Sequence, residues 1–467
     1  MSNASTIAQP SEQLTQADVP LALEHRSMAE LSDAISSLLE NKAPIWWSSA
    51  MAVTLPLTLL CLGLLAYLIS TGVGVLGNNH PLAWAWDAAN FLFWISIAHG
   101  GLLLSAGLFL TRQKWRSSIH RSAEAMSLFA LVCAGLYPAL HLGRVWMAWF
   151  LVPVPNAAGV WQNFRSPLLW NVFALASVFI VAGLVFSVGL IPDLATLRER
   201  CTTKIRPFFY GVLAIGWRGS TRQWHHYQIA TLLLAALSLP LVLSAEASVS
   251  FAFATSLVPG WHTTISPLAF AAGALCGGIA MLLTLLIPVR ALYPPLQDII
   301  TKDHVGKLCK ILLLAGALIG YACLMEFFLA WYSANPYERA AFWYRAFGPY
   351  GWTFWVALLC VGGAPQFFWF KACRSHLLGV WILVQFLTIG LWLQHFGMIA
   401  SALSRDFTPS AWALFYPSWV DVCTFAGTFG LFATLFLLFI RFLPIISMVE
   451  VKALLHESDP PNEEVRS

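Results

Sequence analysis

The sequence predicts an all-α protein that crosses a membrane about ten times. Of its 467 residues, 58% are hydrophobic and only 10% are charged. Its mean hydropathy is +0.71, and a composition of this kind is typical of polytopic membrane proteins. The apolar residues also gather in runs of about 20, the length that an α-helix needs to cross a bilayer.

These runs place the predicted spans in chain order. They lie near 45–74, 85–111, 122–152, 168–191, 228–246, 264–288, 308–333, 351–370, 376–399 and 422–443. An even number of spans puts both termini on one side of the membrane. The side opposite the termini holds only four cations, Arg165, Arg339, Arg345 and Arg405. Because short cytoplasmic loops are enriched in Lys and Arg, we expect both termini in the cytoplasm.

Two sequence matches suggest an internal repeat. Ala148-Trp149 recurs as Ala330-Trp331, and Pro167 and Trp170 recur as Pro349 and Trp352. Both pairs have the same offset, and four spans separate the copies, so the repeats would be parallel. We therefore expect two four-helix bundles, made of spans 2–5 and 6–9, flanked by spans 1 and 10.

This reading divides the chain into five regions. We expect a cytoplasmic tail over 1–44 and the first span with its outer loop over 45–84. The first bundle, up to its cytoplasmic loop, is assigned 85–226 and holds the candidate site, and the second is assigned 227–400 and is the candidate for a proton path. The last span and a cytoplasmic tail make up 401–467.

Polar residues mark the outer half of the first bundle as the candidate site. His141 and Arg144 are expected one turn apart on one face of the third helix, and Asn171 opens the fourth helix at the same depth. Asp87 and Asn90 begin the second helix on that side. An ionisable group within a membrane span is a functional-site hypothesis by default. The alternative is that His141 bonds a neighbouring carbonyl while Arg144 reaches the interface.

Four further ionisable residues lie within apolar runs, each with a structural alternative. His99 precedes two glycines that permit close helix packing, so it is either functional or held in a structural hydrogen bond. Glu124 lies at the start of its helix, where its negative charge interacts favourably with the helix dipole, or it opens a proton path. Glu326 lies well inside the seventh span and is expected to be neutral or paired. Glu246 is placed near the outer end of the fifth span, at the interface.

No cofactor motif stands out. The cysteines lack the CxxC and CxxCH spacings of iron–sulfur and covalent haem sites, and the histidines offer no repeated pairing for a b-type haem. We expect no metal site, no nucleic-acid partner and no cofactor bound by this chain alone. A quinol pocket needs a proton acceptor for the hydroxyl groups and an apolar slot for the ring. The outer end of the first bundle is the candidate for such a pocket. Because the chain is expected to hold no cofactor of its own, the electrons would then pass to a partner subunit.

Several longer motifs resemble one family. NFRSPLLWNVFA, GLIPDLATLRER, VPGWHTTISP, MEFFLAWYSANPYE and AGTFGLFATLFLLFIRFLP are similar to segments of the NrfD/PsrC-type integral membrane subunits. The resemblance extends over about 45–452 and is greatest to ActC of bacterial alternative complex III.

The resemblance implies an inner-membrane subunit that takes electrons from menaquinol or ubiquinol on the periplasmic side. The partners it implies are an iron–sulfur subunit, multihaem cytochrome c subunits, a second NrfD-type membrane subunit and a terminal oxidase. Within the proposed pocket, His141 and Asn171 match the positions that the family uses for quinol. His141 is then the catalytic proton acceptor, Arg144 tunes it, and Asp87, Asn90 and His99 complete the site.

The sequence departs from the family pattern at several ionisable positions. Asn171 replaces an Asp, Glu246 replaces a His, Ala252 replaces an Asp, and Val361 replaces an Asn. A fifth segment, around Gln394, lacks the Glu and Arg of the pattern. Asparagine can bond a quinol oxygen but cannot accept its proton. The losses count against proton translocation, for which Glu124, Glu246 and Glu326 are the remaining candidates.

Three rival functions stay open at this point. The first is a non-catalytic scaffold of the same complex. The second is the membrane subunit of a quinone-reducing molybdopterin and iron–sulfur oxidoreductase. A secondary transporter is the third, and it requires helices broken by Gly or Pro at matching places in both halves. Only the segment 362–365 fits that pattern.

Overall fold

The computed structural model describes residues 35–37, 39–152, 154, 159, 164–201, 205–261, 263–405 and 408–458. Within these residues, ten helical segments are long and apolar enough to cross a membrane, and no strand occurs. The prediction of an all-α polytopic membrane protein is confirmed.

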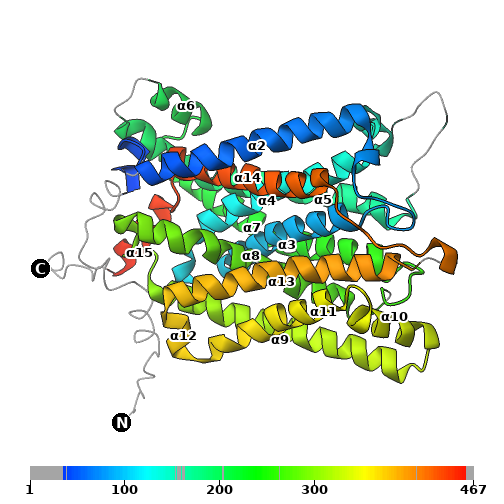
Figure 1. Cartoon of the computed structure of the whole chain (residues 1–467). Coiled ribbons are helices and arrows are strands. Elements are labelled where there is room, and N and C mark those ends of the chain that lie inside the picture. Colours follow the sequence, from blue (N-terminus) through cyan, green and yellow to red (C-terminus); the bar gives the residue numbers. More distant parts are fainter. Residues whose placement is uncertain are drawn as a thin grey trace, which may run out of the picture.

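The ten spans run roughly parallel to one another (Figure 1). They are α2 (Ile45–Thr71), α3 (Ala85–Leu110), α4 (His120–His141), α5 (Pro167–Arg200), α7 (Thr221–Ala254), α8 (Ser266–Leu292), α9 (Lys302–Tyr332), a composite span, α13 (Leu377–Leu403) and α14 (Trp419–Phe442). The composite span joins α11 (Gly351–Ala357), the π-helical turn η5 (Leu358–Gly363) and the 3₁₀ turn η6 (Ala364–Trp369).

Short helices lie at both ends of the spans, between them or after the last one. They are η1 (Val73–Val75), η2 (Lys114–Ser118), η3 (Val145–Leu151), α6 (Arg206–Leu213), η4 (Pro294–Leu296), α10 (Pro336–Phe347), α12 (Lys371–Ser375), η7 (Pro409–Ala411) and α15 (Met448–Ser458). α6, α12 and α15 lie at one end of the molecule and α10 at the other (Figure 1). We call these the inner and the outer end.

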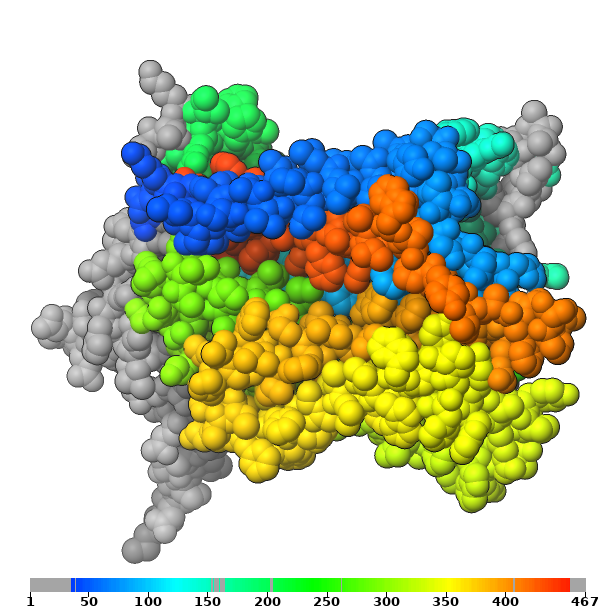
Figure 2. All heavy atoms as spheres, viewed as in Figure 1, coloured from blue at the N-terminus to red at the C-terminus, as the bar shows by residue number. Residues whose placement is uncertain are grey.

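The helices pack in two groups of four. In the first group α3 contacts α4 and α7, while α5 contacts α4 and α7. In the second, α8 contacts α9 and α13, and the composite span contacts α9 and α13. α2 packs along α14 on the side of the first group, as the blue and orange spheres show (Figure 2). Whether the two groups are related as repeats stays a prediction.

α3 and α8 are the most buried spans, and they join the two groups through glycines. A Cβ atom on Gly100 would lie 1.9 Å from the carbonyl oxygen of Ala274, and one on Gly278 would lie 2.4 Å from the carbonyl carbon of Gly100. Two helices can approach this closely only where side chains are missing. The expected packing role of the glycines after His99 is confirmed.

We expect Gly100→Ala to lower the melting temperature of the protein, because the added methyl group forces the two bundles apart. Overpacking of this kind typically costs about 1–3 kcal/mol. Gly107→Ala on the same helix is the control, since a Cβ there would meet nothing within 4 Å. Thermal unfolding in detergent measures both variants, and equal melting temperatures would refute the close contact.

Candidate functional site

The outer end of the first bundle pairs a buried carboxylate with a histidine. Asp87 lies in the first turn of α3, where the helix dipole favours its charge, and only 4% of it is exposed. Its Oδ2 atom lies 3.6 Å from Nδ1 of His141, whose side chain is 31% exposed. Trp84 packs against the His141 ring, with centroids 5.9 Å apart. The pair offers an accessible imidazole backed by a carboxylate.

His141 occupies the end of α4, which corrects the prediction that the helix continues to residue 152. Pro138 removes one backbone donor from the last turn. Gly143 then adopts a φ of +63° and donates to the carbonyl of Leu140, as glycine does after many helix ends. Arg144 therefore lies outside the helix, and the prediction that it shares a helical face with His141 is wrong.

The five outer polar residues do not form one cluster. Asn90 accepts a hydrogen bond from Trp392 of α13 at 2.8 Å and so faces the second bundle. Asn171 accepts one from Ser248 of α7 at 2.9 Å. Among the described residues no hydrogen bond or ion pair joins His141 to Arg144 or Asn171. Residues at the same depth in the membrane can point in different directions around their helices. Of the five, only Asp87 and His141 are paired with each other.

A second pair lies deep in the same bundle. Nδ1 of His99 and Oε2 of Glu246 form a short hydrogen bond between α3 and α7, and both side chains are buried. The interfacial placement of Glu246 is wrong, because α7 continues for two more turns to Ala254. His99 is also no neighbour of Asp87, since twelve residues of helix separate them by about 18 Å. The imidazole and the carboxylate thus satisfy each other inside the bundle.

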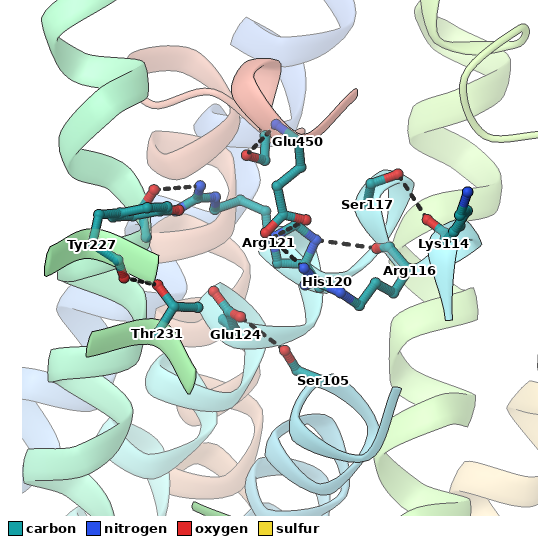
Figure 3. Close-up of polar contacts among 12 residues, drawn as sticks. Ser105, Lys114, Arg116, Ser117, His120, Arg121, Glu124, Tyr227, Thr231 and Glu450 are labelled. Atoms are coloured by element: carbon teal, nitrogen blue, oxygen red, sulfur yellow. Dashed lines mark hydrogen bonds and ion pairs between the residues drawn. The ribbon is translucent and has the colours of Figure 1, made fainter. Parts of the chain in front are cut away.

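Polar side chains also gather at the inner end of the first bundle (Figure 3). Glu124 accepts a hydrogen bond from Ser105 at 2.8 Å. Both residues line a cavity of about 30 Å³, together with His120, Tyr227 and Glu450. That volume is room for about one water molecule.

A fully buried ion pair adjoins this cavity. Arg121 donates to Asp193 of α5 at 3.0 Å, and their side chains are 1% and 0% exposed. Arg121 also donates to the carbonyl of Gly189, while Asp193 accepts from the backbone of Val449. Arg121 lies just before the predicted span 122–152, in the segment expected to connect two spans, so the sequence did not predict this buried pair. A charged residue directly after Pro192 in an apolar helix was the available signal.

α15 closes the inner end through Glu450. Its carboxylate lies 2.9 Å from Arg116 and 3.5 Å from Nε2 of His120. Burial by itself would raise the pKa of Glu450, but the neighbouring His120 and Arg116, with Arg121, hold that pKa below its ordinary value of 4.5. The Glu450 carboxylate is therefore charged at neutral pH and fastens α15 to α4 and η2.

We expect the contribution of Glu450 to the docking of α15 to be complete above about pH 4.5 and to be lost as the pH falls below it. A lowered pKa in the folded state stabilises that state above the unfolded pKa, and this contribution is lost as the pH falls through the folded value. Glu450→Gln should increase opening of α15 at pH 7 about fivefold. Hydrogen exchange over residues 448–453, corrected for intrinsic rates, measures it. Glu199→Gln is the control, and unchanged protection at pH 3.5 would contradict the prediction.

Glu326 belongs to a different part of the molecule. It accepts from Arg345 of α10 at 3.1 Å, and the two side chains are 23% and 15% exposed. The expectation that Glu326 is neutral or paired is confirmed. The pair lies at the outer end of the second bundle, apart from the ionisable residues of the first.

No cluster of three or more His, Cys, Asp or Glu side chains suited to a metal ion occurs among the described residues.

A family profile described as polysulphide reductase, NrfD, matches residues 74–404. The chain belongs to the NrfD family. The match covers all the spans of the two bundles, α3 to α13. A search of curated proteins found no match.

Members of the NrfD family are membrane subunits of quinone-interacting oxidoreductases, and they assemble with iron–sulfur subunits. This NrfD-type chain is accordingly a multi-pass integral membrane protein. The narrower resemblance to ActC stays a prediction.

Proposed function

We propose that the chain binds a quinol at the outer end of the first bundle and passes its electrons to a partner subunit. The Asp87–His141 pair is the observation that carries the proposal. It offers a proton acceptor open to a ligand, supported from behind by a buried carboxylate. The electrons would leave through an iron–sulfur subunit and then cytochrome c, as in alternative complex III.

The pair can receive both protons of the reaction. Oxidation of a quinol to a quinone releases two protons and two electrons. His141 takes the first proton from a hydroxyl group, and Asp87 stabilises the imidazolium that forms. Transfer of that proton to Asp87 then leaves His141 free for the second. Asn171, held by Ser248, can donate a hydrogen bond to a quinol oxygen but takes no proton.

Proton translocation across the membrane has weaker support. Glu124 and Glu246 lie in the first bundle, while Glu326 is paired in the second. Along α3 the steps from Asp87 to His99 and from His99 to Ser105 are about 18 and 9 Å. Both steps exceed a hydrogen bond by far, so these pairs alone form no continuous path. We retain Glu124 and Glu246, with His99, as the candidates and remove Glu326 from the path.

For the cellular setting we propose the bacterial inner membrane, with the inner end facing the cytoplasm. The Lys and Arg distribution supports this orientation. The quinol site then faces the periplasm, where an iron–sulfur subunit, multihaem cytochrome c subunits, a second NrfD-type subunit and a terminal oxidase are the proposed partners.

Quinol-dependent reduction of an electron acceptor by the purified, assembled complex tests the proposal. Turnover is expected with the full set of subunits and not with the isolated chain. Quinone reduction as the physiological direction would favour the molybdopterin-type alternative. Full turnover that survives loss of the His141 imidazole would favour the scaffold reading.

A further inference from the structure

A second, larger cavity lies at the outer end of the other bundle. Its volume is about 480 Å³, which falls in the range of small-molecule sites. It lies between the outer ends of α9 and α13, the helix α10, and residues 259–261, 263 and 264 of the segment between α7 and α8. Trp261, Phe342 and Tyr344 line it, together with Leu329 and Met398. The cavity thus has an apolar and aromatic wall.

Hydrogen-bonding groups converge on this wall from three elements. Glu326 of α9 and Arg345 of α10 line the cavity as an ion pair. Thr263, from the segment between α7 and α8, is a third polar residue of the lining.

The charges of the lining balance. Glu338 lines the cavity too and accepts a hydrogen bond from the backbone of Gly260 at 3.0 Å. Arg405 lies over the ring of Tyr344 at 3.5 Å and over that of Trp412 at 4.7 Å. The two carboxylates would repel an anionic ligand, and the two guanidinium groups would repel a cationic one. A neutral ring that carries both donors and acceptors suits the lining best.

We propose that this cavity binds the head group of a quinone or quinol, separately from His141. Arg345 has further N–H groups with which to donate to a quinone oxygen, and Glu326 has a second oxygen that can accept from a quinol hydroxyl. Trp261 and Phe342 pack beside the ring. The proposal rests on the proposed function only for the class of ligand, since the two sites share no residue.

Photoaffinity labelling of the assembled complex with an azidoquinone tests the proposal. We expect labelled peptides from 259–264, 326–345 and 398–405, and we expect excess unlabelled quinone to suppress the label. Glu326→Gln should reduce this label by about tenfold, because the neutral amide oxygen is a weaker acceptor than the carboxylate and no longer forms an ion pair with Arg345. Glu199→Gln, on an exposed ion pair of α5, is the matched control. Equal melting temperatures of the two variants establish that both are folded.

His141→Ala separates this site from the proposed catalytic one. It should remove turnover and leave the second-bundle label unchanged. Label in the cavity without any quinol turnover would sink the proposed function and keep the second site. Quinol turnover with label confined to the first bundle would overturn the second site and keep the proposed function. A phospholipid found in the cavity by native mass spectrometry, and not displaced by quinone, would also overturn the proposal.

Discussion

His141→Ala is expected to lower quinol oxidation by the assembled complex by about 10²-fold or more, the range in which general acid–base groups act. The imidazole is the accessible member of the Asp87–His141 pair, so its loss leaves no proton acceptor in contact with a ligand. Because the ring is partly exposed and terminates α4, its removal should leave the fold intact. Turnover with a fixed quinol concentration, together with subunit stoichiometry, measures the effect.

Two further variants make this result specific. His226→Ala removes an exposed histidine at the start of α7 and should leave turnover unchanged. Asp87→Asn keeps the size of the side chain but removes its charge, and we expect a smaller decrease than for His141→Ala. A His141→Ala complex that assembles and turns over at the wild-type rate would place the quinol elsewhere. If turnover collapses in an assembled His141→Ala complex, Asn171→Asp becomes informative, since it adds a second proton acceptor.

Asp193→Ala is expected to destabilise the protein by about 3–5 kcal/mol. The substitution leaves the guanidinium of Arg121 buried without its carboxylate, in a position where 1% of the side chain is exposed. It also removes the acceptor for the Val449 backbone, so α15 should loosen as well. The free energy of unfolding in a detergent titration measures the loss.

Replacing both partners separates the charge from the packing. The double variant Arg121→Met with Asp193→Leu should recover most of the stability, because apolar pairs of similar volume substitute well for buried ion pairs. Glu199→Ala, which breaks an exposed pair one and a half turns further along α5, should cost under about 1 kcal/mol. If Asp193→Ala is no worse than Glu199→Ala, the Arg121–Asp193 contact contributes little to folding.

The sequence by itself determined the fold class and the positions of most spans. Long apolar runs have one stable arrangement in a bilayer, where every backbone group must be satisfied within the helix. The same reasoning predicted that Glu326 is neutral or paired and offered a structural hydrogen bond for His99. The family match then confirmed the type of protein.

Only the tertiary structure decided which polar groups meet. Depth along a helix follows from counting residues, but direction around the helix depends on how neighbouring spans pack. Asp87 and Asn90 lie within one turn, yet Asp87 faces His141 of α4 and Asn90 faces Trp392 of α13. Glu246 lies inside the bundle, hydrogen-bonded to His99, because α7 extends beyond its most apolar part. Arg121 pairs with Asp193 because α4 packs against α5, and α15 covers the pair with a hydrogen bond from the Val449 backbone.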